Sequence, residues 1–114
     1  SEADAIEEGT IYFDYDKYDL SASAILEIRE LANAMKSNLS ARIRIEGHCD
    51  ERGTREYNLA LGEKRANAVS ELLRVNGVAS SKLTTVSYGE EKPVAYGSNE
   101  AAWGKNRRAE IKVL

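Results

Sequence analysis

Residues 46–68 read EGHCDERGTREYNLALGEKRANA. This stretch predicts a strand end, a charged turn and the first half of a helix in direct succession. It also contains His48 and Cys49, the only histidine and the only cysteine of the 114 residues. We therefore look here first for any chemistry that the chain performs.

The sequence before this stretch predicts a strand, a helix and a second strand. Residues 10–16, TIYFDYD, alternate in polarity and are rich in β-branched and aromatic residues, as half-buried strands are. Ser21 or Ser23 can cap a following helix, whose apolar residues recur at helical spacing until residues 38–41. Residues 42–46, RIRIE, alternate again and predict the second strand.

The sequence after the turn predicts a long helix and two further strands. The helix begins at Thr54 or Arg55 and ends at Asn76-Gly77, a common C-terminal pair because glycine readily adopts the left-handed conformation. The remaining elements are a third strand, a short helical turn and a fourth strand, at residues 83–88, 100–105 and 108–114.

Two glycines indicate positions where another segment comes close. Gly47 follows the second strand and marks a point where the backbone bends or is approached closely. Gly62 lies inside the long helix, where glycine costs about 1 kcal/mol relative to alanine. Such a residue usually has a close packing neighbour.

The order β-α-β-α-β-β predicts an α+β fold, a two-layer α/β sandwich with a four-stranded sheet and helices on one face. A chain of this length fits one domain. We assign residues 10–114 to that domain. Residues 1–9 are acidic with little to bury, and we expect them to form a flexible N-terminal arm.

Composition and charge argue against a nucleic-acid binder and against a membrane-spanning helix. The net charge of −3 and the pI near 5.3 argue against a nucleic-acid binder, which would carry a basic patch. One cysteine cannot form an intrachain disulfide, so the redox compartment stays open. No apolar run approaches the ~20 residues of a membrane-spanning helix. An export signal or lipid anchor is expected only in sequence upstream of Ser1.

A cluster of polar residues is predicted at the strand ends. Asn58 and Arg65 are seven residues apart and therefore share one face of the long helix, about 20° apart around its axis. That face packs toward the sheet, so Arg65 needs an anionic partner. Asp50 ends the second strand and Asp16 ends the first. If both strands end at the same edge, these four residues form a cleft that suits a zwitterion.

Other interpretations of these residues stay open or are disfavoured. Asp50 and Arg65 could form a purely structural ion pair. A cysteine nucleophile with a histidine base is disfavoured, because His48 and Cys49 are neighbours on a strand and point to opposite faces. One histidine and one cysteine also give too few soft ligands for zinc, so no metal and no cofactor are expected. The aromatic residues Tyr57 and Trp103 could stack on a sugar or peptide, or simply pack.

Four motifs in order resemble the OmpA-like peptidoglycan-binding domain, over about residues 10–114. They are FDYDKYDL at residues 13–20, GHCDERGTREYNLALGEKRANAV at 47–69, VSYGEEKPVAYG at 86–97 and KNRRAEI at 105–111. Cys49 stands where threonine or alanine is commoner in the family. None of the departures from the family pattern removes a charged group.

The resemblance implies a non-catalytic domain with a mixed sheet that binds the meso-diaminopimelate of the peptidoglycan stem peptide. The family's site residues fall on six positions of this chain: Tyr15, Asp16, Asp50, Asn58, Arg65 and Arg107. In the family, the residues at positions 50 and 65 meet the ammonium and the carboxylate of the ligand.

Within the family, the motifs are most similar to the lipid-anchored members of the Tol-Pal system. These lie on the periplasmic face of the Gram-negative outer membrane, tether it to the cell wall and bind TolB. Two alternatives follow from the same resemblance. The chain could be an adaptor whose main ligand is TolB, or the peptidoglycan-binding end of a flagellar stator or of an outer-membrane barrel protein.

Overall fold

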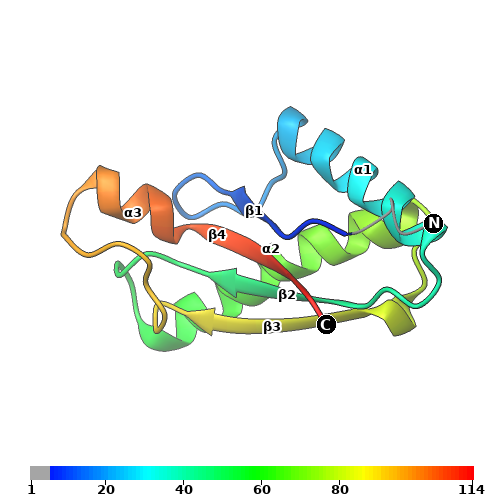
Figure 1. The fold of residues 1–114 in the computed structure, drawn as a ribbon. Helices are drawn as coiled ribbons and strands as arrows, with labels where there is room; N and C mark the ends of the chain where they lie inside the picture. The colour runs from blue at the N-terminus through cyan, green and yellow to red at the C-terminus, as the bar shows by residue number, and fades with distance from the viewer. Residues whose placement is uncertain (1–5) are drawn as a thin grey trace.

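Four strands and three α-helices form the fold of the computed structural model, which describes residues 6–114 (Figure 1). In chain order the elements are β1 (Gly9–Tyr12), α1 (Ala22–Ser37), β2 (Ile43–His48), α2 (Arg55–Val75), the 3-10 turn η2 (Ser80–Lys82), β3 (Leu83–Gly89), α3 (Glu100–Asn106) and β4 (Arg108–Val113).

The strands form one mixed sheet in the order β1-β4-β2-β3. β2 and β3 are parallel and are connected through α2, as a parallel pair requires a crossover. β4 is antiparallel to both β1 and β2. The predicted α+β fold with a mixed four-stranded sheet is therefore confirmed. Because β1 and β2 both oppose β4, they run in the same direction and end at the same edge of the sheet.

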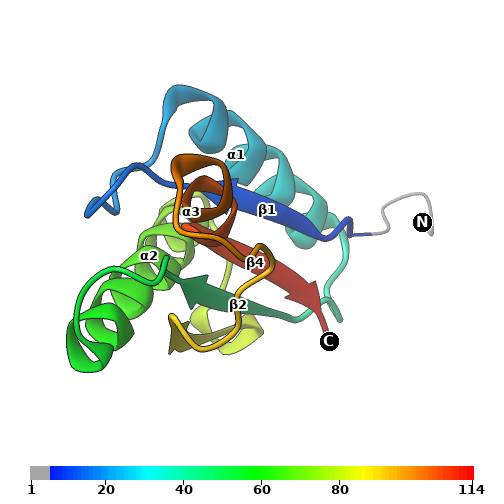
Figure 2. The ribbon, with the colours of Figure 1, turned by 90° about the vertical axis from the view of Figure 1, so that its left-hand side faces the viewer.

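Helices α1 and α2 cover one face of this sheet and enclose the hydrophobic core. Ile43 and Ile45 of β2 and Ile111 of β4 contribute to the core from the sheet, and Ile28 and Leu73 contribute from the helices. The helix α3 lies at the end of the sheet, near the β1–α1 loop and the end of β2 (Figures 1 and 2). The other face of the sheet carries the alternate, polar residues of β2 and β4.

Side-chain caps fix where the helices begin. The Ser21 hydroxyl accepts a hydrogen bond from the Ala24 amide, so Ser21 is the cap of α1. The Thr54 hydroxyl accepts from the Tyr57 amide and caps α2. At the other end of α2, Gly77 has a φ of +100°, in the left-handed region that ends helices. The predicted bounds of this helix are confirmed.

The two glycines lie at a close contact between β2 and α2. A Cβ atom placed on Gly47 would lie 1.7 Å from the Gly62 carbonyl oxygen. A Cβ atom on Gly62 would lie 2.3 Å from the Ser87 hydroxyl and 3.0 Å from the Gly47 carbonyl oxygen. The close approach predicted at both positions is confirmed, and it sets the position of α2 on the sheet.

The first strand is shorter than predicted. β1 ends at Tyr12, whereas the alternating pattern continues to Asp16. Asp16 has a φ of 57°, which no strand residue adopts. Arg65 also donates hydrogen bonds to the carbonyls of Asp14 and Lys17, so that this segment follows the helix instead of the sheet. The loop consequently brings Tyr15 and Asp16 to the end of β2.

The flexible arm expected at residues 1–9 falls partly outside the described residues, which begin at residue 6. In the described part, Ile6 packs against the core and Gly9 opens β1. The Glu8 carboxylate accepts a hydrogen bond of 2.8 Å from the Val113 amide. Ordered contacts therefore begin before residue 10. Within residues 6–114, no helix has both the length and the apolar character that crossing a bilayer requires.

Candidate functional site

A small pocket of about 50 Å³ opens at the sheet edge where β1 and β2 both end. Five of the six predicted site residues line it: Tyr15, Asp16, Asp50, Asn58 and Arg65. The other lining residues are Cys49, Arg52, Gly53, Tyr57 and Leu61. The sequence-based expectation that the strand ends and α2 converge on one cleft is thus met in the structure.

Arg65 is the floor of this pocket and is almost fully buried, with 1% of its surface exposed. Its guanidinium donates to three backbone carbonyls, those of Lys17 at 2.9 Å, His48 at 2.9 Å and Asp14 at 3.1 Å. Burial lowers the pKa of Arg65 below its usual value. The two terminal nitrogens each carry a second N–H that these bonds do not use.

Asp50 is a buried carboxylate that lines the pocket together with Arg65. Arg52 Nη2 contacts its Oδ2 at 2.8 Å, and Arg107 Nη1 lies 3.6 Å from the same oxygen. Burial alone would raise the pKa of Asp50, but the hydrogen bonds and charge of Arg52, with the charge of Arg107, hold the pKa below its usual value. Within residues 6–114, Asp50 pairs with Arg52 and Arg107 and forms no ion pair with Arg65, so the alternative of a structural ion pair between Asp50 and Arg65 is wrong.

Asn58 and Asp16 occupy the sides of the pocket. The Asn58 amide nitrogen donates to the Arg52 carbonyl at 2.9 Å and to the Glu90 carboxylate, which fixes the turn before α2. Asp16 accepts a hydrogen bond from the Tyr57 hydroxyl. The amide nitrogen of Asn58 is therefore engaged with the protein, whereas Asp16 stands on the exposed rim.

Arg107 lies behind the pocket and does not line it. Its Nε donates to the Phe13 carbonyl at 2.8 Å, and its Nη2 contacts Glu100 at 2.6 Å. Its Nη1 also donates to Glu100, at 3.2 Å, and lies 3.6 Å from the Asp50 carboxylate. In this arrangement Arg107 ties the start of β4 to the β1–α1 loop, and its charge helps to lower the pKa of Asp50.

Arg52 also lines the pocket, although the sequence marks it only as one residue of a charged turn. Its guanidinium lies 4.0 Å from the centre of the Tyr15 ring and 3.9 Å from that of the Trp103 ring. Its hydrogen bonds to Asp50 raise the pKa of Arg52. Trp103 Nε1 in turn donates to the Glu51 carboxylate at 3.0 Å. The two aromatic partners come from segments 88 residues apart, and no local spacing reveals the stack.

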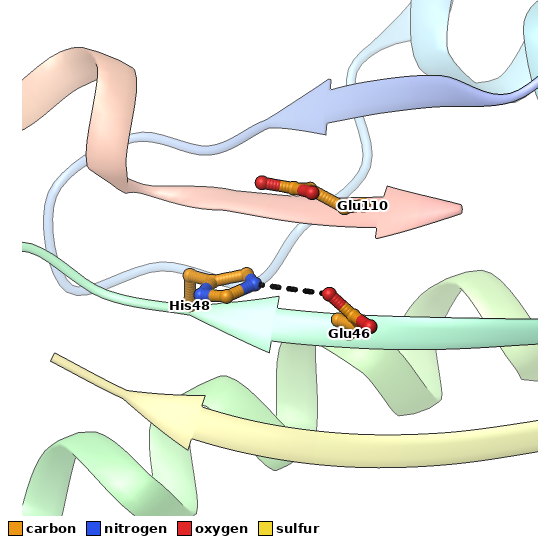
Figure 3. Close-up of side chains that lie close together, drawn as sticks. All are labelled: Glu46, His48 and Glu110. Atoms are coloured by element: carbon orange, nitrogen blue, oxygen red, sulfur yellow. Dashed lines mark ion pairs between the residues drawn. The ribbon is translucent and has the colours of Figure 1, made fainter. Parts of the chain in front are cut away.

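Cys49 is buried in the pocket wall and lacks a base. Its thiol donates to the Asn58 carbonyl, and burial raises the pKa of Cys49 to about 11. His48 has its ring on the other face of the sheet, beside Glu46 (Figure 3). The predicted separation of these two neighbouring side chains is confirmed.

A larger hollow of about 410 Å³ lies between β1, the residues before it and α1. Its floor is apolar, and four glutamates lie along it: Glu7, Glu8, Glu27 and Glu30. It brings no cation next to a carboxylate, unlike the pocket at the strand ends. The pocket at the strand ends therefore carries the candidate site.

The sequence pattern of the OmpA family matches residues 12–107, which include all six predicted site positions. The chain belongs to the OmpA family. This result confirms the resemblance on which the site residues were assigned.

Relatives within the OmpA family carry one name repeatedly. The chain is 50% identical over 103 residues to the peptidoglycan-associated lipoproteins of Pseudomonas putida and Pseudomonas aeruginosa. These matches cover 90% of this chain and 61% of each relative, so the chain spans about three fifths of their length. These matches confirm the resemblance to the lipid-anchored members of the family.

Solved structures give the same grouping. The crystal structure of the peptidoglycan-associated lipoprotein from Burkholderia pseudomallei is 45% identical, with a TM-score of 0.90 over 92% of this chain and 89% of that chain. The C-terminal domain of Helicobacter pylori MotB has a TM-score of 0.84 at 23% identity, over 93% of this chain and 84% of that chain. At that identity the second match shows only that the fold is shared.

Proposed function

We propose that this chain is a non-catalytic anchor that binds peptidoglycan through the meso-diaminopimelate of its stem peptide. The observation that carries the proposal is the pocket itself, a space of about 50 Å³ lined by the carboxylates of Asp16 and Asp50 and by Arg65. Relatives at 50% identity named peptidoglycan-associated lipoprotein support the same ligand class.

The charges match a zwitterionic end group. The unused N–H groups of Arg65 suit a carboxylate of the ligand, because a guanidinium can bind a carboxylate through two parallel hydrogen bonds. Asp50 stays ionised because its pKa is lowered, and with Asp16 it accepts the ligand ammonium. Diaminopimelate ends its side chain with an ammonium and a carboxylate on one carbon, so both charges reach the pocket together.

Arg52 and Tyr15 form the outer wall in this proposal. The Arg52 side chain is 30% exposed and held by stacking between Tyr15 and Trp103. On binding, the ligand ammonium shares Asp50 with Arg52, which stays in place on its aromatic neighbours. The Asn58 amide holds the turn that presents Asp50, and the charge of Arg107 helps to lower the pKa of Asp50.

A catalytic role is not proposed, because the pocket has no activated nucleophile. The Cys49 thiol has a pKa of about 11 and is protonated at neutral pH. The histidine that could serve as its base lies across the sheet (Figure 3). Binding without turnover is the activity that these groups support.

The wider role that we propose is a tether between the outer membrane and the cell wall. The full-length protein would carry a lipid anchor upstream and lie on the periplasmic face of the Gram-negative outer membrane, within the Tol-Pal system. We propose TolB as a second partner. The exposed rings of Tyr15 and Tyr57 beside the pocket, at 56% and 53% exposure, supply an apolar surface for such a protein.

Sister functions on the same fold are less well supported. The MotB domain of the flagellar stator is matched at 23% identity, against 50% for the lipoproteins. A TolB adaptor without peptidoglycan binding would leave the buried charges of Arg65 and Asp50 without a ligand. Competition between TolB and stem peptide in solution separates that alternative from ours.

Cosedimentation with purified sacculi tests the proposal. We expect Asp50→Asn to lose most of the binding of the wild type, because removing one partner of a buried charge pair can cost ~2–5 kcal/mol of binding free energy. Glu71→Gln removes the same charge from an exposed position of α2 and should bind normally. Circular dichroism confirms that each variant is folded. Wild-type cosedimentation of Asp50→Asn would exclude this pocket as the binding site.

Amide NMR shifts identify the end group. A stem peptide with meso-diaminopimelate should shift the signals of Asp16, Asp50 and Arg65. A matched peptide with lysine, which lacks the second carboxylate, should shift them far less. Equal shifts with both peptides would contradict the role that we give to Arg65.

A further inference from the structure

We propose that Glu46, His48 and Glu110 form a binding site for one Zn²⁺ ion, on the face of the sheet that α1 and α2 leave uncovered. The three side chains come from neighbouring strands, since Glu46 on β2 lies opposite Glu110 on β4 in the register of the sheet. His48 is two residues further along β2 and shares their face. Figure 3 shows the three side chains grouped above the two strands.

The ligand atoms of the three residues are close enough to share an ion. One nitrogen of His48 and one oxygen of each glutamate all lie within 4.8 Å of one another. His48 Nε2 is 3.7 Å from Glu46 Oε1. Two ligands on a tetrahedral Zn²⁺ ion, each about 2.0–2.1 Å from it, are about 3.4 Å apart. The observed separation is too long for a good hydrogen bond and close to this spacing.

The state of His48 is a second, independent observation. The residue is 2% exposed, and within residues 6–114 neither of its ring nitrogens has a hydrogen-bond partner. Leaving a buried polar group unsatisfied costs about 1–3 kcal/mol, so such groups are uncommon. A metal ion held by Nε2 would satisfy one of the two nitrogens. Imidazole nitrogen and carboxylate oxygen are both ligands that Zn²⁺ accepts.

The surroundings keep the imidazole in the form that binds metal. Burial, together with the charge of Arg108, lowers the pKa of His48 to about 4, against the smaller opposite effect of the two glutamates. The ring is therefore neutral at pH 7. The Tyr88 ring stacks on it with centroids 5.4 Å apart and fixes its orientation. A water molecule would complete a tetrahedral site with three protein ligands.

Three cationic side chains contact the carboxylates of Glu46 and Glu110, and two of these side chains are exposed enough to be displaced by a metal ion. Arg44 contacts Glu46 at 2.9 Å and Lys112 contacts Glu110 at 3.1 Å, and both cationic side chains are 39% exposed. Arg108 is 3% exposed and is held by the carbonyls of Asn106 and Lys92, so it stays beside Glu110. Zn²⁺ would thus compete with Arg44 and Lys112 for the carboxylates. Removal of Arg44 should tighten binding.

This site differs from a zinc site built on His48 and Cys49, whose side chains point to opposite faces of the strand. The two carboxylate ligands come from the same face, and Glu110 is 62 residues away from His48 in the chain. The proposed Zn²⁺ site does not depend on peptidoglycan binding, since Glu46, His48 and Glu110 do not line the pocket at the strand ends.

The test is calorimetric titration of the tag-free, chelator-treated chain with ZnCl₂. We expect one ion per chain. Glu46→Gln and Glu110→Gln should each weaken binding at least about tenfold, because even the partners of metal ligands can contribute ~10–100-fold. Arg44→Met should bind more tightly than the wild type. Arg74→Met breaks a similar exposed pair with Glu71 on α2 and should bind like the wild type.

Co²⁺ in place of Zn²⁺ gives a second readout. Absorption bands typical of a tetrahedral site should appear with the wild type and be lost with Glu110→Gln, while circular dichroism shows that both are folded. Absence of saturable Zn²⁺ binding by the wild type would overturn the proposal. Equal affinity of the wild type, Glu46→Gln and Glu110→Gln would overturn it as well, because the ion would then lie elsewhere.

Discussion

His48 is a buried, neutral side chain whose protonation works against the fold. Its pKa is about 4 in the folded chain and 6.5 for an ordinary histidine. When the pH falls below 6.5, the unfolded chain takes up this proton first, so the free energy of unfolding falls between pH 6.5 and pH 4. The full difference corresponds to roughly 3 kcal/mol.

Urea denaturation in steps between pH 7 and pH 5, with a chelator present, measures this effect. His48 is the only histidine, and carboxylates titrate mainly below this pH range. His48 therefore dominates the slope of the free energy of unfolding against pH. We expect His48→Gln to be less stable at pH 7 and to lose most of the slope. A slope unchanged by the substitution would contradict a neutral, buried His48.

At the scale of single residues, the sequence predicted positions better than roles. Asp16, Asp50 and Arg65 follow from strand ends and helical spacing, and they do line one pocket. The hydrogen bonds of Arg65 go to backbone carbonyls, which every residue has and no pattern marks. The stack of Arg52 between two aromatic rings joins distant segments, so it could be found only once the fold was known.

Among the elements, the contact between β2 and α2 tolerates almost no added volume. Gly47→Ala would place a methyl group 1.7 Å from a backbone oxygen of Gly62, which no side-chain rotation can relieve. We expect a loss of stability of about 3 kcal/mol or more, at the upper end for overpacking. Gly9→Ala meets no atom within 4 Å and should change stability little.

Thermal or urea denaturation of both variants measures the difference. Because α2 carries Arg65, a displaced helix should also weaken binding to sacculi in any Gly47→Ala protein that still folds. Equal stability of the two variants would contradict the close packing of α2 on β2.

The two serines at the start of α1, the N-cap Ser21 and Ser23 in the first turn, allow a second comparison at this scale. The Ser21 hydroxyl accepts from the Ala24 amide, and its hydroxyl also contacts that of Ser23. Ser21→Ala should therefore cost about 1 kcal/mol, the usual contribution of a helix N-cap. Ser23→Ala removes only the exposed contact and should cost less. Urea denaturation of the two variants decides between them, and a larger cost for Ser23→Ala would reassign the cap.

The elements themselves were largely predictable, because each follows from a local period. The bounds of α2 agree with the sequence reading, as its cap and its terminal glycine are local signals. The early end of β1 was not predictable, since Arg65 draws the segment after Tyr12 away from the sheet from 48 residues further along the chain. The strand order also lay beyond the sequence, because it depends on pairing between distant strands.

For the whole molecule, one strand serves both of the sites that we propose. The carbonyl of His48 accepts a hydrogen bond from Arg65 beneath the pocket, whereas its ring joins the glutamate cluster on the other face. The alternation of a strand separates the two environments across the thickness of one sheet. Of the conspicuous His48-Cys49-Asp50 triplet, Cys49 and Asp50 therefore line the pocket, whereas the His48 ring lies on the other face of the sheet.

A ligand that binds the folded chain and not the unfolded chain must raise the free energy of unfolding of the whole molecule. At a stem-peptide concentration 100 times Kd, the free energy of unfolding should rise by about 2.7 kcal/mol. The increase should need diaminopimelate and should vanish in Asp50→Asn, since the unfolded chain cannot assemble the pocket from the β1–α1 loop, β2 and α2. Thermal denaturation with increasing peptide measures the increment, and Glu71→Gln should respond like the wild type. If Asp50→Asn gained as much stability as the wild type, the peptide would bind outside this pocket, and the charges around Arg65 would be purely structural.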